Sequence, residues 1–152
     1  MRTKRLLALL FFTLSCSATT LHAGTPEQEK AFTDKYKTAY EAKDTATLES
    51  FLYTKDANPM ALEFYKMMVS NGAGGKVSKI ELVDLSPEDA KKADEAMDGP
   101  GGAKMRLALK PTKKLKITVE TKDSNGSSSS TSESFVAEKD GKFVIPVPVT
   151  AK

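Results

Sequence analysis

The chain has 152 residues, of which 39% are hydrophobic and 28% charged, and its formal charge is +3. Its one cysteine and one histidine both lie within the first 23 residues. A chain that lacks those residues has neither, which would exclude disulfides, His-based catalytic triads and ordinary zinc sites. This length is enough for one domain to bury a core without covalent support.

The first 23 residues have the three-part layout of a secretory signal peptide. Basic residues after Met1 precede an unbroken apolar stretch, Leu6 to Phe12, and small and polar residues follow up to Ala23. The apolar stretch is too short to cross a bilayer, which takes about 20 residues. We therefore expect a bacterial chain that is exported to the periplasm or secreted and is cleaved after Ala23, with residues 24–152 as a single domain.

Cleavage there would remove both Cys16 and His22 and would reduce the formal charge from +3 to zero. A neutral domain gives no argument for nucleic acid as a partner. One alternative keeps Cys16, because Ser15-Cys16 after an apolar run is also typical of a lipoprotein acylation site, although Thr13 stands where such sites favour Leu. Membrane association is expected only in that case.

The next residues predict two helices. Thr25-Pro26-Glu27-Gln28 is a capping box with a first-turn proline, and the helix that it begins should run to about Lys43. Asp44 or Thr45 can cap a short second helix. The buried residues of that second helix should be Leu48, Phe51 and Leu52.

Asn58-Pro59 begins a third helix, again with a capping residue and a first-turn proline. Its segment Met60 to Val69 is apolar almost all round, which predicts that the helix is covered on more than one side. Residues 71–75 are glycine-rich and should end it. They lack the signature of a phosphate-binding loop.

The remainder alternates with period two, as antiparallel strands with one solvated face do. Strands are expected at residues 76–85, 105–110, 114–121, 131–138 and 142–147. Asn125-Gly126 and Asp140-Gly141 are tight-turn signals, and Pro146 and Pro148 should end the final strand at a sheet edge. A short helix capped by Ser86 should run through Met97, a loop should follow at 98–102, and Ser127 to Ser130 should be irregular.

Two motifs carry a resemblance to a known family. One is the helix–turn–helix Tyr40-Glu41-Ala42-Lys43-Asp44-Thr45-Ala46-Thr47-Leu48, and the other is the hairpin Phe135 to Ile145 with its central Asp-Gly turn. Together with the order of the elements, they resemble small exported bacterial members of the nuclear transport factor two-like superfamily, across most of residues 24–152. Many relatives have Trp where Phe143 stands, and the insertion Ser86 to Gly102 is longer than such domains usually need.

The resemblance implies an α+β fold, the cystatin-like roll, in which N-terminal helices pack on a curved antiparallel sheet of about five strands. A conical apolar pocket can remain between the first helix and the sheet. The expected core is Phe32, Tyr36, Leu48, Phe51, Leu52, Leu62, Tyr65, Met68, Ile80, Leu82, Leu107, Leu109, Ile117, Val119, Phe135, Phe143 and Ile145.

The third helix and the first helix supply the candidate ligand-binding residues. Tyrosine combines an apolar ring with a hydrogen-bonding tip, and methionine adapts to irregular ligands. The simpler interpretation is that aromatic and methionine side chains at helical spacing fill a core. The candidates are Tyr36, Tyr40, Tyr65, Met67 and Met68.

The leading hypothesis is a non-enzymatic domain, without cofactor or metal, that binds a small apolar ligand or a protein partner and that could form oligomers. A second is an envelope-tethered structural or assembly lipoprotein acylated at Cys16. A third is isomerase-like catalysis with Tyr40 or Tyr65, which would require a buried carboxylate. The acidic residues that the sequence places lie at caps, turns or solvated faces, and the lysine cluster at residues 110–116 is typical of a solvated sheet edge.

Overall fold

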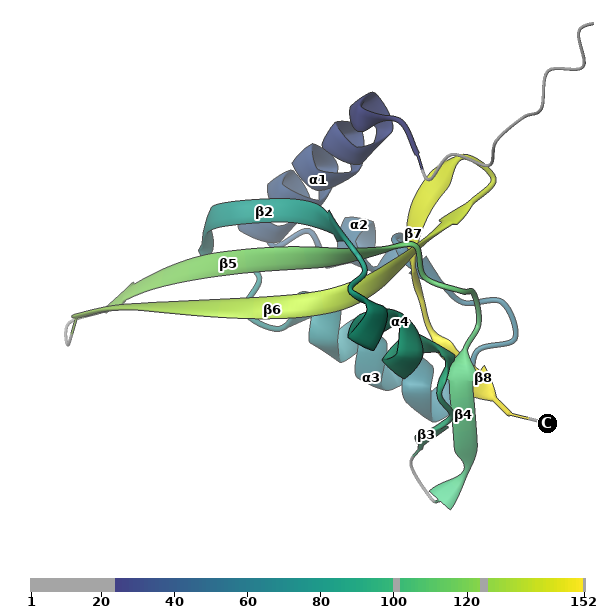
Figure 1. The fold of residues 1–152 in the computed structure, drawn as a ribbon. Coiled ribbons are helices and arrows are strands. Elements are labelled where there is room, and N and C mark those ends of the chain that lie inside the picture. Colours follow the sequence, from purple (N-terminus) through teal and green to yellow (C-terminus); the bar gives the residue numbers. More distant parts are fainter. Residues whose placement is uncertain (1–23, 100–101, 124–125, 152) are drawn as a thin grey trace, which may run out of the picture.

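The structure, a computed structural model, describes residues 24–99, 102–123 and 126–151, so the predicted leader with Cys16 lies outside the described residues. The fold is α+β, with three helices N-terminal to most of a mixed sheet of five strands (Figure 1). The elements are α1 (Pro26–Glu41), α2 (Thr45–Glu49), β1 (Leu52–Tyr53), α3 (Pro59–Ser70), β2 (Lys76–Asp84), α4 (Pro87–Asp94), β3 (Met97–Asp98), β4 (Lys104–Leu107), β5 (Lys113–Asp123), β6 (Gly126–Lys139), β7 (Lys142–Pro146) and β8 (Pro148–Thr150).

The helices begin where the sequence predicts. Thr25 and Gln28 form the reciprocal capping box of α1, Asp44 caps α2 through the Thr47 amide, and Asn58 caps α3. Each cap accepts a hydrogen bond from a backbone N–H that lacks a partner within the helix. Local chemistry is therefore sufficient to set these three starting points.

The main sheet has the strand order β1-β7-β6-β5-β2. β2, β5, β6 and β7 are antiparallel neighbours, whereas β1 runs parallel to β7 with Leu52 opposite Ile145. The prediction of an entirely antiparallel sheet is therefore wrong at this edge. Phe51 and Leu52 are buried as expected, but they lie beyond the end of α2 because the chain extends there to reach β7.

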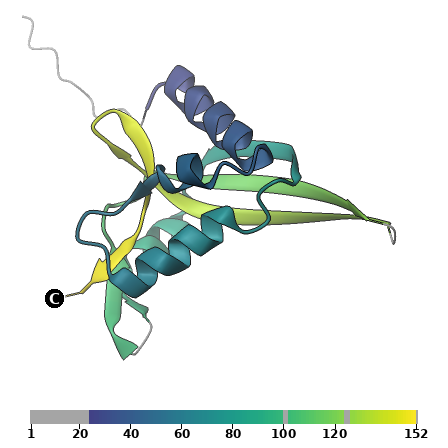
Figure 2. The ribbon, with the colours of Figure 1, turned by 180° about the vertical axis from the view of Figure 1, so that it is seen from behind.

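The sheet separates the helices into two layers. α1, α2 and α3 lie against one face, in front in Figure 2, and α4 lies on the other face, in front in Figure 1. Aromatic side chains join α1 to the sheet: the Phe32 ring lies 5.1 Å from the Phe51 ring and 5.8 Å from the Phe143 ring, both edge-on. A small second sheet, in the order β3-β4-β8, packs beside α3.

Several predictions for the second half of the chain are wrong in detail. Ser127 to Ser130 is not irregular but belongs to β6, because each residue pairs with one on β5. The short helix ends at Asp94, and Met97 opens β3. The predicted last strand, residues 142–147, corresponds to β7, but β7 lies inside the main sheet and not at an edge. A further strand, β8, begins at Pro148 and lies at the edge of the small sheet.

Most of the predicted core positions are buried, and the exception on β6 shows which residues of that strand face the solvent. Phe135 and Leu109 are only half-buried, whereas Val136 is fully buried, because Phe135 lies opposite Lys114 on the solvated face of the sheet. Leu62, Tyr65, Ile80 and Leu82 are partly buried against the core, and Met68 is half-buried. The buried residues that the sequence did not single out include Leu115 and Val147.

Helix α3 packs against α2, the core and β8, but it leaves one stripe exposed although its sequence is apolar almost all round. Met60, Phe64 and Met67 are 58%, 53% and 62% exposed. These residues are spaced by four and three, so they form one stripe along the helix, while Ala61 and Val69 face the core. Within residues 24–99, 102–123 and 126–151, no helix is both long enough and apolar enough to cross a membrane.

Candidate ligand-binding cleft

A cleft lies between α1, the C-terminal end of α3 and the inner face of β5 and β6, with a volume of about 250 Å³. Its floor is apolar, because Leu115, Ile117 and Val119 alternate with polar residues along β5 and all three point inward. Met68 and Val69 form the wall on α3.

Strand β6 adds a row of hydroxyl groups beside the apolar floor. Its register with β5 places Ser134 opposite Leu115, Ser132 opposite Ile117 and Ser130 opposite Val119. Opposed residues of an antiparallel pair point to the same face, so these three serines, the serine row, also line the cleft. Ser132 and Ser134 lie in the predicted strand 131–138 but were not predicted to line a site, and Ser130 lies in the run predicted to be irregular. All three share the period-two phase of the buried Val136.

Two tyrosines from α1 close the cleft on the third side. Tyr36 and Tyr40 are one helical turn apart, and their rings stack with centroids 6.5 Å apart. The Tyr40 hydroxyl donates to the Asn71 carbonyl oxygen at 3.2 Å. None of the hydrogen bonds between described residues involves the Tyr36 hydroxyl, although the residue is only 4% exposed.

The Tyr36 hydroxyl therefore keeps a small accessible surface, and the residue lines the cleft. The reason is that no side-chain oxygen or nitrogen of the described residues is fully buried without a hydrogen-bond partner. Burial, with a smaller contribution from Tyr40, raises the pKa of Tyr36 to about 12. The group stays protonated at neutral pH, so it can donate one hydrogen bond and accept another.

The cleft has little electrostatic field of its own. Glu133 lies at its rim, but the carboxylate binds the Lys114 and Lys116 ammonium groups at 2.9 and 2.8 Å, and those lysines belong to the opposite face of the sheet. Hydrogen bonds from Lys116 and Lys114 lower the pKa of Glu133, so it stays ionised there. Within the described part of the chain, the cleft offers hydroxyl groups and apolar surface.

The five predicted ligand-binding residues do not come together. Tyr36, Tyr40 and Met68 line the cleft, whereas Tyr65 lines a different groove of about 500 Å³ between α3 and the small sheet. Burial raises the pKa of Tyr65 there. Met67 lies on the exposed stripe of α3. Helical position accounts for the split, because residues 65, 67 and 68 point in three directions around the helix.

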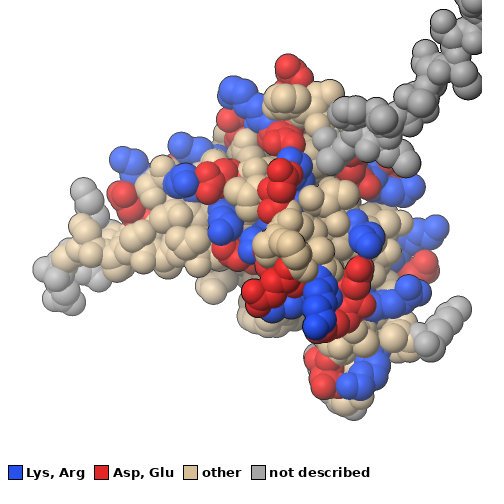
Figure 3. All heavy atoms as spheres, viewed as in Figure 1, with Lys and Arg blue, Asp and Glu red and all other residues tan. Residues whose placement is uncertain are grey.

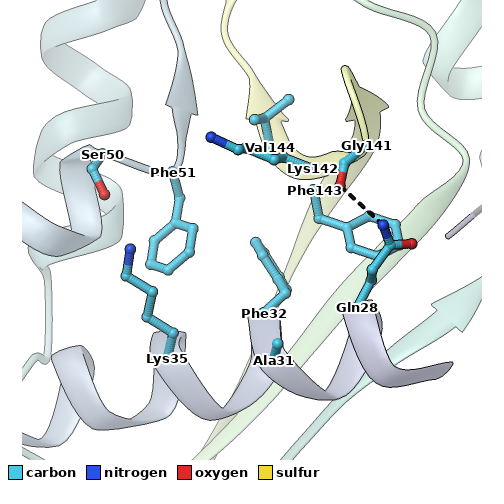
Figure 4. A pocket seen from close by; sticks show the side chains of 10 residues that line it. All are labelled: Gln28, Ala31, Phe32, Lys35, Ser50, Phe51, Gly141, Lys142, Phe143 and Val144. Carbon is cyan, nitrogen blue, oxygen red and sulfur yellow. Dashed lines mark hydrogen bonds between the residues drawn. The ribbon is translucent and has the colours of Figure 1, made fainter. Parts of the chain in front are cut away.

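Another depression, with a volume of about 360 Å³, lies at the N-terminal half of α1. Its lining residues are drawn in Figure 4. The Gln28 side chain crosses it: its Nε2 donates to the Gly141 carbonyl oxygen at 3.2 Å and its Oε1 accepts from the Thr25 amide at 2.7 Å. The Lys35 ammonium lies 5.5 Å from the centre of the Phe51 ring. These contacts tie α1 to the β6–β7 turn, so we assign this depression a structural role.

The described residues contain neither a buried carboxylate nor a group of metal-ligating side chains. None of their aspartates or glutamates is buried, and they contain no group of three or more metal-ligating side chains. The carboxylate that isomerase-like catalysis requires is therefore not found beside Tyr40 or Tyr65 in residues 24–99, 102–123 and 126–151.

Comparisons of the chain with protein families, with curated proteins and with solved structures found no match.

Proposed function

We propose that this chain is an exported, non-enzymatic binding domain that holds a small neutral ligand in the cleft. The observation that carries the proposal is Tyr36, which lines this cleft with its apolar floor and whose hydroxyl has no hydrogen-bond partner among the described residues. Apolar pockets with a few oriented polar groups are typical of small-molecule sites. The serine row would add further donors and acceptors along one side.

The volume of the cleft limits the size of the ligand. A cavity of about 150 Å³ accommodates benzene, and one water molecule takes about 30 Å³. The 250 Å³ of the cleft therefore suits a ligand somewhat larger than benzene. A neutral body with one hydroxyl or carbonyl group would match both the floor and the Tyr36 hydroxyl.

The test uses two probes that differ by one hydroxyl group, 4-ethylphenol and ethylbenzene, with binding measured by two-dimensional NMR titration. Tyr36→Phe should weaken the binding of 4-ethylphenol about fivefold, which is the effect of one lost hydrogen bond. The binding of ethylbenzene should stay unchanged. Tyr53→Phe, which removes a tyrosine hydroxyl from another part of the surface, is the matched control.

A second pair of variants tests the place of binding. Ser132→Leu should fill the cleft and abolish the binding of both probes, whereas Thr131→Leu, on the opposite face of β6, should leave binding intact. The proposal is wrong if neither probe shifts the amide signals of the cleft residues, or if Ser132→Leu binds both probes as well as the unchanged chain.

We also propose that the α+β arrangement is a cystatin-like roll of the nuclear transport factor two-like superfamily, in its small exported bacterial branch. The support is the Lys43-Asp44 turn between α1 and α2, and the hairpin closed by Asp140 and Gly141. An experimental structure in which the sheet does not curve around α1 would remove this proposal.

Export leaves a chemical signature at the N-terminus that separates the alternatives. Cleavage after Ala23 would give a chain that begins at Gly24, in the periplasm or outside the cell. The lipoprotein alternative would give an acylated Cys16 instead, and with it a membrane anchor. Intact-mass measurement of the protein isolated from its natural source distinguishes these two products, and a chain that still begins at Met1 would contradict both.

A further inference from the structure

Strand β6 has one edge that the fold leaves open. β6 is 14 residues long, and its residues from Gly126 to Val136 pair with β5, whereas its pairing with β7 covers only Ala137 to Lys139. From Gly126 to Val136, no described strand pairs with the other edge. Figures 1 and 2 show the same arrangement: the outer part of β5 and β6 extends beyond the helices as a two-stranded arm.

The hydrogen-bond pattern shows which groups point to this open edge. The Thr112 amide donates to the Val136 carbonyl oxygen at 2.9 Å, so residue 136 and the other even-numbered residues face β5. Lys139 pairs with Lys142 across the two-residue turn Asp140-Gly141, and the pair that closes such a hairpin exchanges its hydrogen bonds. Odd-numbered residues of β6 therefore face β7, which gives the same phase. The N–H and C=O groups of Ser127, Ser129, Thr131, Glu133 and Phe135 therefore point outward.

The open edge lacks the devices that usually prevent strand-to-strand association. Such edges carry prolines, bulges or inward charges, or they are covered by another element. Here the register with β5 runs without a shift, the segment contains no proline, and Ser127 to Glu133 are exposed. The single charge, Glu133, is neutralised by Lys114 and Lys116. In Figure 3 the charged side chains gather over the body of the molecule, and the border of the arm is largely uncharged.

We propose that the open edge of β6 pairs with the same edge of a second copy of this chain, antiparallel and with the two-fold axis at Ser130. Small hydroxyl side chains form no pockets that would select a foreign peptide, because side-chain pockets give such strand addition its specificity. The edge matches itself, however. Ser129 meets Thr131 and Glu133 meets Ser127, so no like charges are opposed.

The position of the axis follows from the ends of the open edge. An axis at Glu133 would oppose two carboxylates, and an axis nearer to Phe135 would push the second copy against β7. With the axis at Ser130, residues 126–134 of both copies pair, and four pairs of residues exchange about eight main-chain hydrogen bonds. The two main sheets then form one continuous sheet, with both serine rows on the same face.

Two double variants of residues 24–152 test this register by sedimentation equilibrium. Ser129→Lys/Thr131→Lys places lysines opposite lysines and should weaken dimerisation at least tenfold. Ser129→Glu/Thr131→Lys shares one of these changes but places Glu opposite Lys, so it should dimerise at least as well as the unchanged chain. Circular dichroism checks that both variants keep their fold.

Thr131→Pro removes one outward N–H and should also weaken the dimer, while Thr131→Ala keeps that N–H and should not. Hydrogen exchange gives an independent readout. The amides of residues 127, 129, 131 and 133 should become protected as concentration rises, whereas those of 128, 130 and 132 should be protected throughout. The proposal is overturned if the unchanged chain stays monomeric up to about 1 mM, or if the two double variants dimerise equally well.

Discussion

The contact between Gly24 and Glu138 predicts that a chain beginning at Gly24 docks its terminal ammonium group against the domain. The Gly24 amide donates to Glu138 Oε2 at 2.8 Å, across 114 residues of sequence. A Cβ atom at residue 24 would lie 2.3 Å from the Phe143 ring, so only glycine fits this close approach. If the chain is cut after Ala23, this amide becomes an ammonium group, and the hydrogen bond becomes an ion pair.

Glu138→Gln should therefore lower the free energy of unfolding more in a processed chain than in an unprocessed one. A hydrogen bond between neutral groups contributes about 0.5–1.5 kcal/mol, and one to a charged group about 1.5–3 kcal/mol. Because Glu138 is partly exposed, we take values near the lower ends. The expected difference between the two chains is about 1 kcal/mol. With an unfolding entropy of about 2.1 cal/mol/K for each residue from 24 to 152, this is about 4 °C in melting temperature.

The assay is a double-mutant cycle followed by thermal unfolding. The processed chain is released from a fusion protein so that it begins at Gly24, and the second chain carries a few extra residues before Gly24. Asp140→Asn is the control, because it removes an exposed ion pair from the same hairpin and keeps a residue that tolerates the positive φ there. Equal effects of Glu138→Gln in both chains would refute the docked ammonium group.

Three further predictions concern stability. Gly72→Ala should cost about 1–3 kcal/mol in chemical denaturation, since φ is +75° and the new Cβ would lie 2.7 Å from the Tyr40 hydroxyl; an unchanged midpoint would contradict this. Leu48→Ala should cost about 2–5 kcal/mol in the same assay, because the side chain is 0% exposed, and a loss below 1 kcal/mol would mean that the site collapses or is solvated. Hydrogen bonds from Lys114 and, to a smaller extent, from Ser86 lower the pKa of Asp89 to about 2. Because the pKa in the unfolded chain is near 4, the carboxylate stabilises the fold above that pH, and this stabilisation is lost as the pH falls toward 2. Asp89→Asn should therefore reduce the fall in melting temperature between pH 4 and pH 2, and an identical fall would argue against the ion pair.

Three of the five predicted ligand-binding residues line the cleft, and two do not. Tyr36, Tyr40 and Met68 line one cleft, and the helical spacing of the two tyrosines was enough to place them on one face. Tyr65 and Met67 are neighbours of Met68 in sequence but lie elsewhere, since only packing decides which direction around α3 faces the sheet. The serine row has no chemical signal of its own, and it acquires a role only through its register with β5.

The sequence by itself determined the local features: the starts of α1, α2 and α3, the Asp140-Gly141 turn and the alternating strand β5. Caps, turns and alternation depend on residues a few positions apart, so the chain specifies them without reference to the rest. The tertiary structure alone decided the parallel pairing of β1 with β7, the extension of β6 through the serines and the exposed stripe of α3. Those outcomes depend on which distant segments meet, and a polar strand or an apolar helix face is compatible with more than one partner.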